Sequence, residues 1–355
     1  MVWDPSSTKA FDGRRVLVTG HTGFKGTWLC LWLDSLGAEV TGLSLPADVN
    51  SLYLRAGLAG RWPERLEDIR TYSLVDRSIN QLQPEIIFHL AAQPIVSASY
   101  DDPMGTFTTN ALGTMHVLEA ARRAESVVGC IVVTTDKVYR PTPDGRRHVE
   151  GDPLGAHDPY SASKAAAEHV VDAWRAMTSR DARPTLVSAR AGNVIGGGDF
   201  AANRLLPDLV RAFSTNSVCE IRRPGYTRPW QHVLDPLSGY LALGASIIAG
   251  RPVPESLNFG PEREETVAVV ADFAASAWGA GATWREVESG GMSETPALAL
   301  DSNLALRTLG WSPTWTTQEA VSRTVGWWQR AESGTSPVEL CLNDIDDFTA
   351  ASKSA

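Results

Sequence analysis

A glycine-rich turn near the amino terminus constrains the fold of this chain more than any other feature. Gly20, Gly23 and Gly26 follow the short β-branched stretch 15–19 and precede the apolar stretch 27–33, which reads as a helix. Glycines let the backbone turn sharply and approach a pyrophosphate closely, while the start of the helix offers free N–H groups to the anion. The sequence therefore predicts a strand, turn and helix that bind a dinucleotide, with the spacing G-x-x-G-x-x-G in place of the usual G-x-G-x-x-G.

Buried strands alternating with helices are expected along the rest of the first half. Apolar runs predict strands at 40–45, 86–90, 130–134 and 185–189. We therefore expect an α/β fold, a Rossmann-like doubly wound parallel sheet with a smaller, discontinuous α/β substrate-binding lobe. The expected divisions are a dinucleotide-binding domain over 1–190 with a return segment at about 233–262, a lobe from 191–232 and 263–335, and a polar, mobile C-terminal tail over 336–355.

Composition limits the classes of partner and the cellular compartment that we expect for this chain. The 355 residues, 43% of them hydrophobic, can bury a sizeable core. The formal charge of −9 argues against a nucleic-acid partner, which normally requires a basic surface. The sequence has no apolar run long enough for a membrane span and no export segment, so we expect a cytoplasmic protein. The four cysteines, which show no metal-ligand spacing, are expected to be reduced thiols, and no metal site is predicted.

A tyrosine and a lysine in the middle of the chain have the spacing of a proton-transfer pair. Tyr160 and Lys164 are four residues apart, so on a helix they share one face. A phenol with a pKa of about 10 is a poor base at neutral pH, and a nearby ammonium group favours its ionised form. Thr135 ends a predicted strand, where side chains of a doubly wound sheet face the ligand crevice. These residues predict oxidation of a hydroxyl group by hydride transfer.

Four longer stretches carry a family resemblance. They are residues 19–26, 89–94, 190–199 and 228–233. With them the chain resembles the extended short-chain dehydrogenase/reductases from about Gly13 to Trp328, and within that family the nucleotide-sugar 4,6-dehydratases, above all the members that act on CDP-glucose. The resemblance implies oxidation of the sugar at C4, loss of water across C5 and C6, and return of the hydride to C6.

The resemblance also assigns roles to five residues. Tyr160 would be the base for oxidation, Lys164 its electrostatic partner and a ligand of the nicotinamide ribose, and Thr135 a hydrogen-bond partner of the C4 oxygen. Asp136 would be the general acid for the departing hydroxyl group, which requires a raised pKa. Lys137 stands where most 4,6-dehydratases have Glu. The members that act on CDP-glucose resemble this chain in having Lys there. Lys137 is either the C5 base or proton shuttle, or it stabilises an enolate or pairs with Asp136.

The resemblance and the redox-neutral cycle favour NAD as the cofactor. No Asp or Glu stands at the end of the second predicted strand, where a ribose ligand is usual, and Lys25 is open to three readings: a contact for a 2′-phosphate, a contact for the pyrophosphate, or a solvated helix residue. The predicted cofactor-binding residues are Gly20, Thr22, Gly23, Phe24, Lys25, Gly26, Asp68, Ile69, Leu90, Ala91, Ala92, Tyr160 and Lys164.

The expected partners are a nucleotide-sugar substrate and a second copy of the chain. Arginine binds phosphate bidentately and amides reach sugar oxygens, so the predicted substrate residues are Gln93, Ser97, Asn193, Arg204 and Arg228. The resemblance implies a homodimer that pairs through helices at 114–124 and 163–177, although their Ala-rich faces can equally pack inside one chain.

Three alternatives remain open from the sequence. A nucleotide-sugar C4 epimerase shares the glycine turn, the tyrosine and the lysine, but it does not need Asp136 and Lys137. A 4,6-dehydratase of a GDP- or dTDP-linked sugar would keep the whole set, because the base is inferred from the resemblance alone. A non-catalytic NAD(H)-binding regulator would have no need of a matched acid and base.

Overall fold

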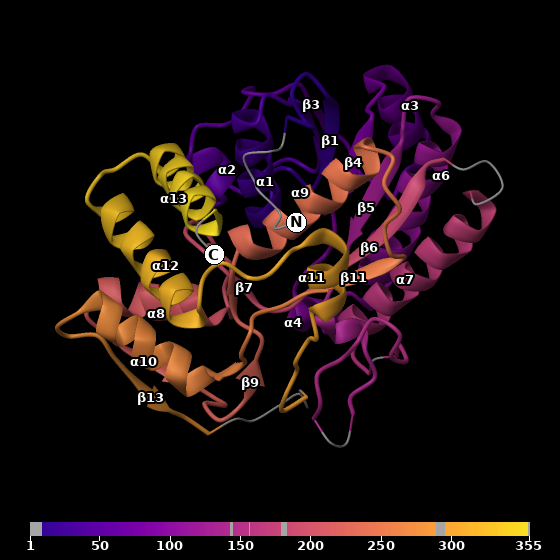
Figure 1. Ribbon diagram of the computed structural model, residues 1–355. Helices are drawn as coiled ribbons and strands as arrows, with labels where there is room; N and C mark the ends of the chain where they lie inside the picture. The colour runs from indigo at the N-terminus through magenta and orange to yellow at the C-terminus, as the bar shows by residue number, and fades with distance from the viewer. Residues whose placement is uncertain (1–8, 143–144, 156, 179–182, 289–294, 354–355) are drawn as a thin grey trace.

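A parallel sheet lies at the centre of the computed structural model, which describes residues 9–142, 145–155, 157–178, 183–288 and 295–353 (Figure 1). Its order is β11-β6-β5-β4-β1-β2-β3, and every pairing is parallel. The strands are β1 (Arg15–Thr19), β2 (Glu39–Ser44), β3 (Glu64–Leu66), β4 (Ile86–His89), β5 (Gly129–Val133), β6 (Thr185–Ala191) and β11 (Ser256–Phe259). The order runs outward from β1 in both directions, so the predicted doubly wound fold is confirmed.

Helices cover both faces of this sheet. One face packs on α1 (Phe24–Ser35) and α9 (Leu234–Ile248), and the other on α3 (Tyr72–Leu82), α6 (Gly113–Arg123) and α7 (Pro159–Thr178) (Figure 1). In β1 the side chains alternate between the two cores, since Val16 and Val18 lie in the first and Leu17 in the second. Short elements complete this unit: α2 (Leu52–Arg55), α4 (Val96–Asp101), α5 (Pro103–Phe107), a π-helical turn (Thr108–Leu112), a 3₁₀ turn (Asp136–Val138) and α11 (Asn303–Leu309).

A smaller lobe with its own core lies below the sheet in Figure 1. It contains three helices, α8 (Leu205–Ser214), α10 (Val267–Trp278) and α12 (Thr317–Glu332). Its short strands pair as β8 (Val218–Ile221) with β13 (Thr283–Glu286), β7 (Val194–Ile195) with β10 (Gln231–His232), and β9 (Thr227–Arg228) with β12 (Glu265–Thr266). The lobe is discontinuous because α9 and β11, which lie between its segments in the chain, belong to the central sheet.

The C-terminal segment differs from the polar, mobile tail expected from the sequence. Residues Pro337–Ser352 form helix α13, whose Leu340, Ile345 and Phe348 are buried. The Phe348 ring contacts Trp32 and Trp315 edge to face, at centroid distances of 5.6 and 5.0 Å. Apolar residues three to five apart give this segment one buried face despite its polar average. Residues 1–8 and 354–355, which the predicted divisions include, lie outside the described residues.

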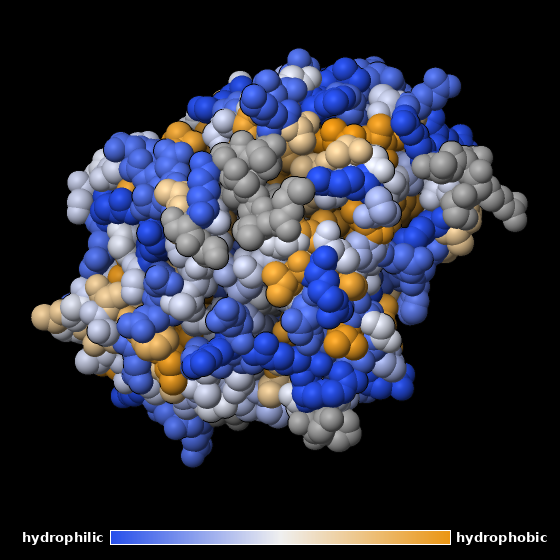
Figure 2. Space-filling view, in the orientation of Figure 1, coloured by the Kyte–Doolittle hydropathy of each residue, from blue (hydrophilic) through white to orange (hydrophobic). Residues whose placement is uncertain are grey.

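On the face drawn in Figure 2, hydrophilic side chains predominate and apolar ones are scattered among them. Within the described ranges, no helix combines the length and the apolar character that crossing a membrane requires.

Candidate active site

The glycine turn is shaped so that side chains are excluded from it. Gly20 has φ +75°, and a Cβ there would lie 2.8 Å from the backbone nitrogen of Ala91. A Cβ on Gly26 would lie 2.1 Å from the carbonyl oxygen of Gly20. Helix α1 starts at Phe24 with no side-chain cap and no acidic residue in its first turn, so its terminal N–H groups stay open to an anion. The observed geometry is the cradle that a dinucleotide pyrophosphate requires.

A buried histidine fixes the neighbouring strand end. The Thr114 hydroxyl donates to the carbonyl oxygen of Asn110 at 2.7 Å, so it accepts from Nε2 of His89 at 3.0 Å. The other ring nitrogen, Nδ1, then accepts from the Thr19 hydroxyl at 2.7 Å, and Thr19 in turn accepts from the Ala91 N–H at 3.2 Å. Burial and the charge of Lys164 lower the pKa of His89 to about 3, so the ring is neutral as this chain of bonds requires.

Hydroxyl groups occupy the place where an acidic ribose ligand is usual. At the end of β2, the side-chain oxygens of Ser44 and Thr22 lie 2.8 Å apart. Farther along the same wall, Asp68 and Ile69 line the cavity, and Asp68 accepts from the Arg70 guanidinium at 2.6 Å. The sequence predicted Asp68 and Ile69 here and missed Ser44 and Arg70. A strand-end serine carries little signal in the sequence because its hydroxyl suits many environments.

The tyrosine and lysine of α7 face the carboxyl end of β5. Both side chains are nearly enclosed and line the same cavity as Thr135. The Lys164 ammonium donates to the carbonyl oxygen of Val133 at 3.1 Å, and the Thr135 side chain is a hydrogen-bond partner of the Tyr160 hydroxyl. The structure therefore brings together three of the five predicted catalytic residues in one corner of the cavity.

The pKa of Tyr160 does not follow the expectation from the sequence. Burial raises it to about 12, outweighing the opposite effects of the Thr135 hydrogen bond and the Arg204 charge, while the charge of Asp136 adds to the rise. The ammonium groups respond to burial in the opposite sense. The pKa of Lys164 falls to about 8, and that of Lys25, which also lies near Lys164 and Arg204, falls to about 7.

Asp136 and Lys137 have different environments. Asp136 is 1% exposed and does not line the cavity; its Oδ1 accepts from the Thr135 hydroxyl at 2.9 Å, and its Oδ2 has no partner among the described residues. Lys137 is half-buried and lines the cavity, and within the described part of the chain its ammonium makes no ion pair. The pairing of Lys137 with Asp136 that the sequence left open is absent.

Of the five predicted substrate residues, four line the cavity and one does not. Ser97, Asn193, Arg204 and Arg228 line the cavity. Arg204 pairs with Asp199 at 2.8 Å, and the Asn193 side-chain oxygen is buried without a partner in the described structure. Gln93 is not in the cavity wall: its amide donates to the Thr106 hydroxyl at 2.9 Å and accepts from the Ile95 N–H at 2.6 Å. Gln93 therefore shapes its own loop.

The lobe supplies a wall that the sequence did not predict. Arg222, Arg223, Tyr226, Pro296 and Leu298 line the cavity beside Arg228. Two adjacent arginines before a Pro-Gly turn were a visible signal for an anion-binding loop. Pro296 and Leu298 gave none, because their place depends on how the chain returns to the lobe.

These walls enclose a cavity of about 1390 Å³ between the sheet and the lobe. A cavity for one drug-sized ligand measures ~300–1,000 Å³, so this one has room for a dinucleotide and a second ligand. In the described ranges, no group of three or more His, Cys, Asp or Glu side chains is placed to hold a metal ion.

Comparisons with known proteins agree with this geometry. The family model described as the NAD dependent epimerase/dehydratase family matches residues 16–260. A CDP-glucose 4,6-dehydratase from Salmonella typhimurium is 40% identical over 96% of this chain and 98% of its own length. A dTDP-glucose 4,6-dehydratase from Xanthomonas campestris is 27% identical over 88% of this chain and 92% of its own. Among solved structures, a UDP-glucose 4-epimerase complex with NAD from Thermus thermophilus has a TM-score of 0.76 and 26% identity, covering 89% of this chain and 99% of that one.

Proposed function

Because the chain belongs to the NAD-dependent epimerase/dehydratase family, we propose that it removes water from CDP-D-glucose to give CDP-4-dehydro-6-deoxy-D-glucose. The observation that carries this proposal is the 40% identity to a CDP-glucose 4,6-dehydratase across nearly the whole of both chains. The cavity supports it, because Thr135, Lys137, Tyr160 and Lys164 face the same space. A C4 epimerase would need no acid and base beyond the tyrosine.

The residues that line the cavity fit the parts of an NAD molecule. The glycine cradle and the open start of α1 would hold the pyrophosphate, Asp68 and Ile69 would contact the adenine end, and Leu90–Ala92 with Lys164 would contact the nicotinamide riboside. When bound, NAD supplies a hydride acceptor that later returns the hydride.

Tyr160 and Lys164 would handle the first proton. The Tyr160 oxygen takes the proton of the C4 hydroxyl group, and Thr135 donates a hydrogen bond to the same oxygen of the sugar. Since burial raises the pKa of Tyr160 to about 12 even against the Thr135 hydrogen bond and the Arg204 charge, a further positive charge must be present beside the phenol at the working pH. Lys164 supplies that charge while it is protonated.

Lys137 and Asp136 would handle the elimination. Lys137 takes the proton from C5, and Asp136 provides the proton for the leaving C6 hydroxyl group. Asp136 lies behind the cavity wall, while the Thr135 hydroxyl in that wall contacts its Oδ1 at 2.9 Å. We therefore propose a relay for the elimination step: once C4 is a ketone, the Thr135 hydroxyl gives its proton to the leaving C6 oxygen and takes a proton from the protonated carboxyl group of Asp136. Asn193, Arg204 and Arg228 would hold the nucleotide and sugar oxygens.

We also propose that the protein is a cytoplasmic homodimer. Support for the dimer comes from α6 and α7, which lie side by side on one face of the sheet and leave Met177 47% exposed (Figure 1). Support for the compartment comes from the cysteines, all four of which are buried and free. Size-exclusion chromatography with light scattering would give the mass of the assembly.

The substrate test uses the purified protein with NAD and, in separate reactions, CDP-glucose, dTDP-glucose, UDP-glucose and GDP-mannose. Mass spectrometry is expected to show the loss of one water from CDP-glucose alone, and Tyr160→Phe should abolish it. Isomerisation without a change in mass would replace the proposal with a C4 epimerase. Water loss from another nucleotide sugar alone would keep the reaction and reassign the nucleotide of the substrate. Cofactor binding without any conversion would favour a non-catalytic regulator.

A further inference from the structure

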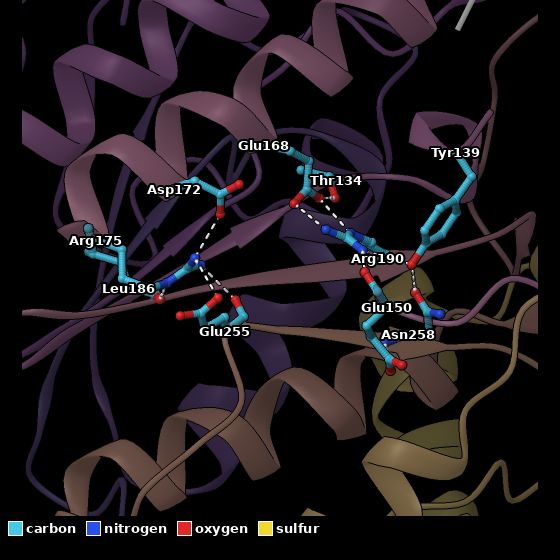
Figure 3. A network of polar contacts seen from close by, with 10 residues as sticks. All are labelled: Thr134, Tyr139, Glu150, Glu168, Asp172, Arg175, Leu186, Arg190, Glu255 and Asn258. Carbon is cyan, nitrogen blue, oxygen red and sulfur yellow. Dashed lines mark hydrogen bonds and ion pairs between the residues drawn. The ribbon is translucent and has the colours of Figure 1, made fainter. Parts of the chain in front are cut away.

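A buried ion pair lies directly behind the predicted catalytic residues. Glu168 of α7 is 1% exposed and faces Arg190 at the end of β6 (Figure 3). The pair is bidentate: Arg190 donates from Nη2 to Oε2 of Glu168 at 2.8 Å and from Nε to Oε1 at 2.9 Å. The Thr134 hydroxyl donates to the same carboxylate. A bidentate pair with a further donor is the arrangement that keeps a buried carboxylate ionised, and the pKa of Glu168 is lowered despite its burial.

The same arginine holds the loop that carries the catalytic threonine. Nη1 of Arg190 donates to the Tyr139 hydroxyl oxygen at 2.8 Å, and Tyr139 donates to Asn258 Oδ1 at 2.7 Å (Figure 3). Thr134 and Tyr139 bracket the stretch 135–138, so the ion pair contacts both ends of it. Displacement of Arg190 or Glu168 would therefore shift the position of Thr135.

Glu168 also extends a row of ionisable side chains along one face of α7. Tyr160, Lys164 and Glu168 are spaced by four residues, so they lie on one face of the helix, one turn apart. Around Lys164, the groups on other elements are Lys25 of α1, whose own pKa is lowered to about 7, the neutral His89 of β4, and Asp136 of the 3₁₀ turn. None of these three shifts the pKa of Lys164 upward. Burial lowers the pKa of Lys164, and the carboxylate of Glu168 is the charge that opposes this.

We propose that Glu168 is a positioning residue whose carboxylate keeps Lys164 protonated beside Tyr160, and that Arg190 keeps that carboxylate ionised and in place. The inference rests on the proposed function for the role of Tyr160 and Lys164. It adds a requirement that nothing in the Tyr-x-x-x-Lys spacing contains: an acidic residue one helical turn beyond the lysine, with its own buried counter-ion.

A second ion pair on the same helix provides a matched control. Arg175 pairs with Asp172 at 2.7 Å and donates to the carbonyl oxygens of Leu186 at 3.0 Å and Glu255 at 2.7 Å (Figure 3). It ties α7 to β6 and to the chain before β11 as the Glu168 pair ties α7 to β6. However, the Asp172 side chain is 58% exposed, and the pKa of Lys164 responds to burial and to the Glu168 carboxylate, not to Asp172. Asp172→Asn therefore removes an ion pair within α7 without changing the charge beside the catalytic lysine.

The test compares Glu168→Gln, Arg190→Lys and Asp172→Asn with the wild-type enzyme, using the pH dependence of kcat for water loss. Lys164 must be protonated, so activity falls as pH rises through its pKa. Glu168→Gln is expected to move this alkaline limb to lower pH by about one unit, which is roughly a tenfold loss of rate well above the limb. Arg190→Lys keeps both charges, so it should lower the melting temperature with little movement of the limb, and Asp172→Asn should leave the limb unchanged.

A second readout does not depend on turnover. The pH dependence of Lys164 acetylation by acetic anhydride, followed by peptide mass spectrometry, reports its protonation directly and should shift in Glu168→Gln as the rate does. If Glu168→Gln does not fold, Thr134→Val, which removes one donor to Glu168 and keeps the side-chain shape, should shift both profiles in the same direction by less. Unchanged acetylation and rate profiles in a folded variant would overturn the inference. Absence of water loss in the wild type would instead overturn the proposed function, while the acetylation profiles would still decide the role of Glu168.

Discussion

Lysine residues in this cavity differ in what surrounds their charge. Lys164 has a buried carboxylate one turn away, and Lys25 lies near two cations, Lys164 and Arg204, as well as the Asp136 carboxyl group. Lys137 lies half-exposed without an ion pair in the described structure. Protonation of each therefore depends on a different neighbour. Of the three, Lys137 is the one two residues from Thr135, the proposed partner of the sugar C4 oxygen, and both line the cavity.

Lys137→Met tests the assignment of the C5 base. Removing the amine while keeping a chain of similar length should lower the rate of water loss about 10²–10⁴-fold, the usual contribution of one positioned base. Cofactor affinity, measured by the quenching of tryptophan fluorescence with NAD, should stay as in the wild type, as it should in the exposed control Lys9→Met. A Lys137→Met enzyme with an undiminished rate would move the base to another residue.

Helix α13 is the element whose contribution the sequence hides best. Its Phe348 lies between Trp32 of α1 and Trp315, which precedes α12, so α13 packs into the core on the α1 face of the sheet. Polar residues dominate the rest of the segment, and its average composition gives no sign of this contact.

Phe348→Ala should lower the free energy of unfolding by about 3–5 kcal/mol, the usual cost of emptying a large aromatic site in a core. Urea unfolding followed by tryptophan fluorescence would measure it. The exposed Asp346→Ala on the same helix is the control and should change the free energy by less than about 0.5 kcal/mol. Equal stability of both variants would mean that α13 is not docked in solution.

At the scale of the whole molecule, the stability of the protein should depend on buried carboxyl groups. Burial raises the pKa of Asp235 to about 7, although its Oδ1 accepts from the Thr314 N–H at 2.7 Å; its Oδ2 has no partner among the described atoms. Between roughly pH 4 and 7 the folded protein therefore holds a proton that the unfolded chain releases. The free energy of unfolding falls as pH rises through this window.

Asp235→Asn removes that titration and keeps an acceptor for Thr314. The variant should gain about 2–4 kcal/mol relative to the wild type at pH 8 and little at about pH 3, where the wild-type carboxyl is mostly protonated in both states. Guanidinium unfolding at the two pH values would measure the difference. A gain of the same size at both pH values would show that packing, and not the charge, sets the cost at this position.

Local patterns in the sequence predicted the elements, and tertiary packing decided what they missed. The glycine turn and the Tyr160–Lys164 spacing are short-range, so both were located from the sequence, and the strand positions agree within a residue or two. The burial of Asp136, the turning of Gln93 into its own loop and the wall at Pro296 depend on chain segments far apart in sequence. No local pattern specifies such contacts.

The core of the lobe is assembled from three separate stretches of chain. Ile195 and Phe213 come from the first, Val270 from the second and Val321 from the third. Between the first two lie α9 and β11, and between the last two lies α11; all three of these elements pack in the core of the sheet. Recombination with a relative is constrained by this arrangement. A crossover that exchanges one stretch places a foreign surface against two resident ones, so chimaeras with a new sugar preference should fold only when all three stretches are inherited together.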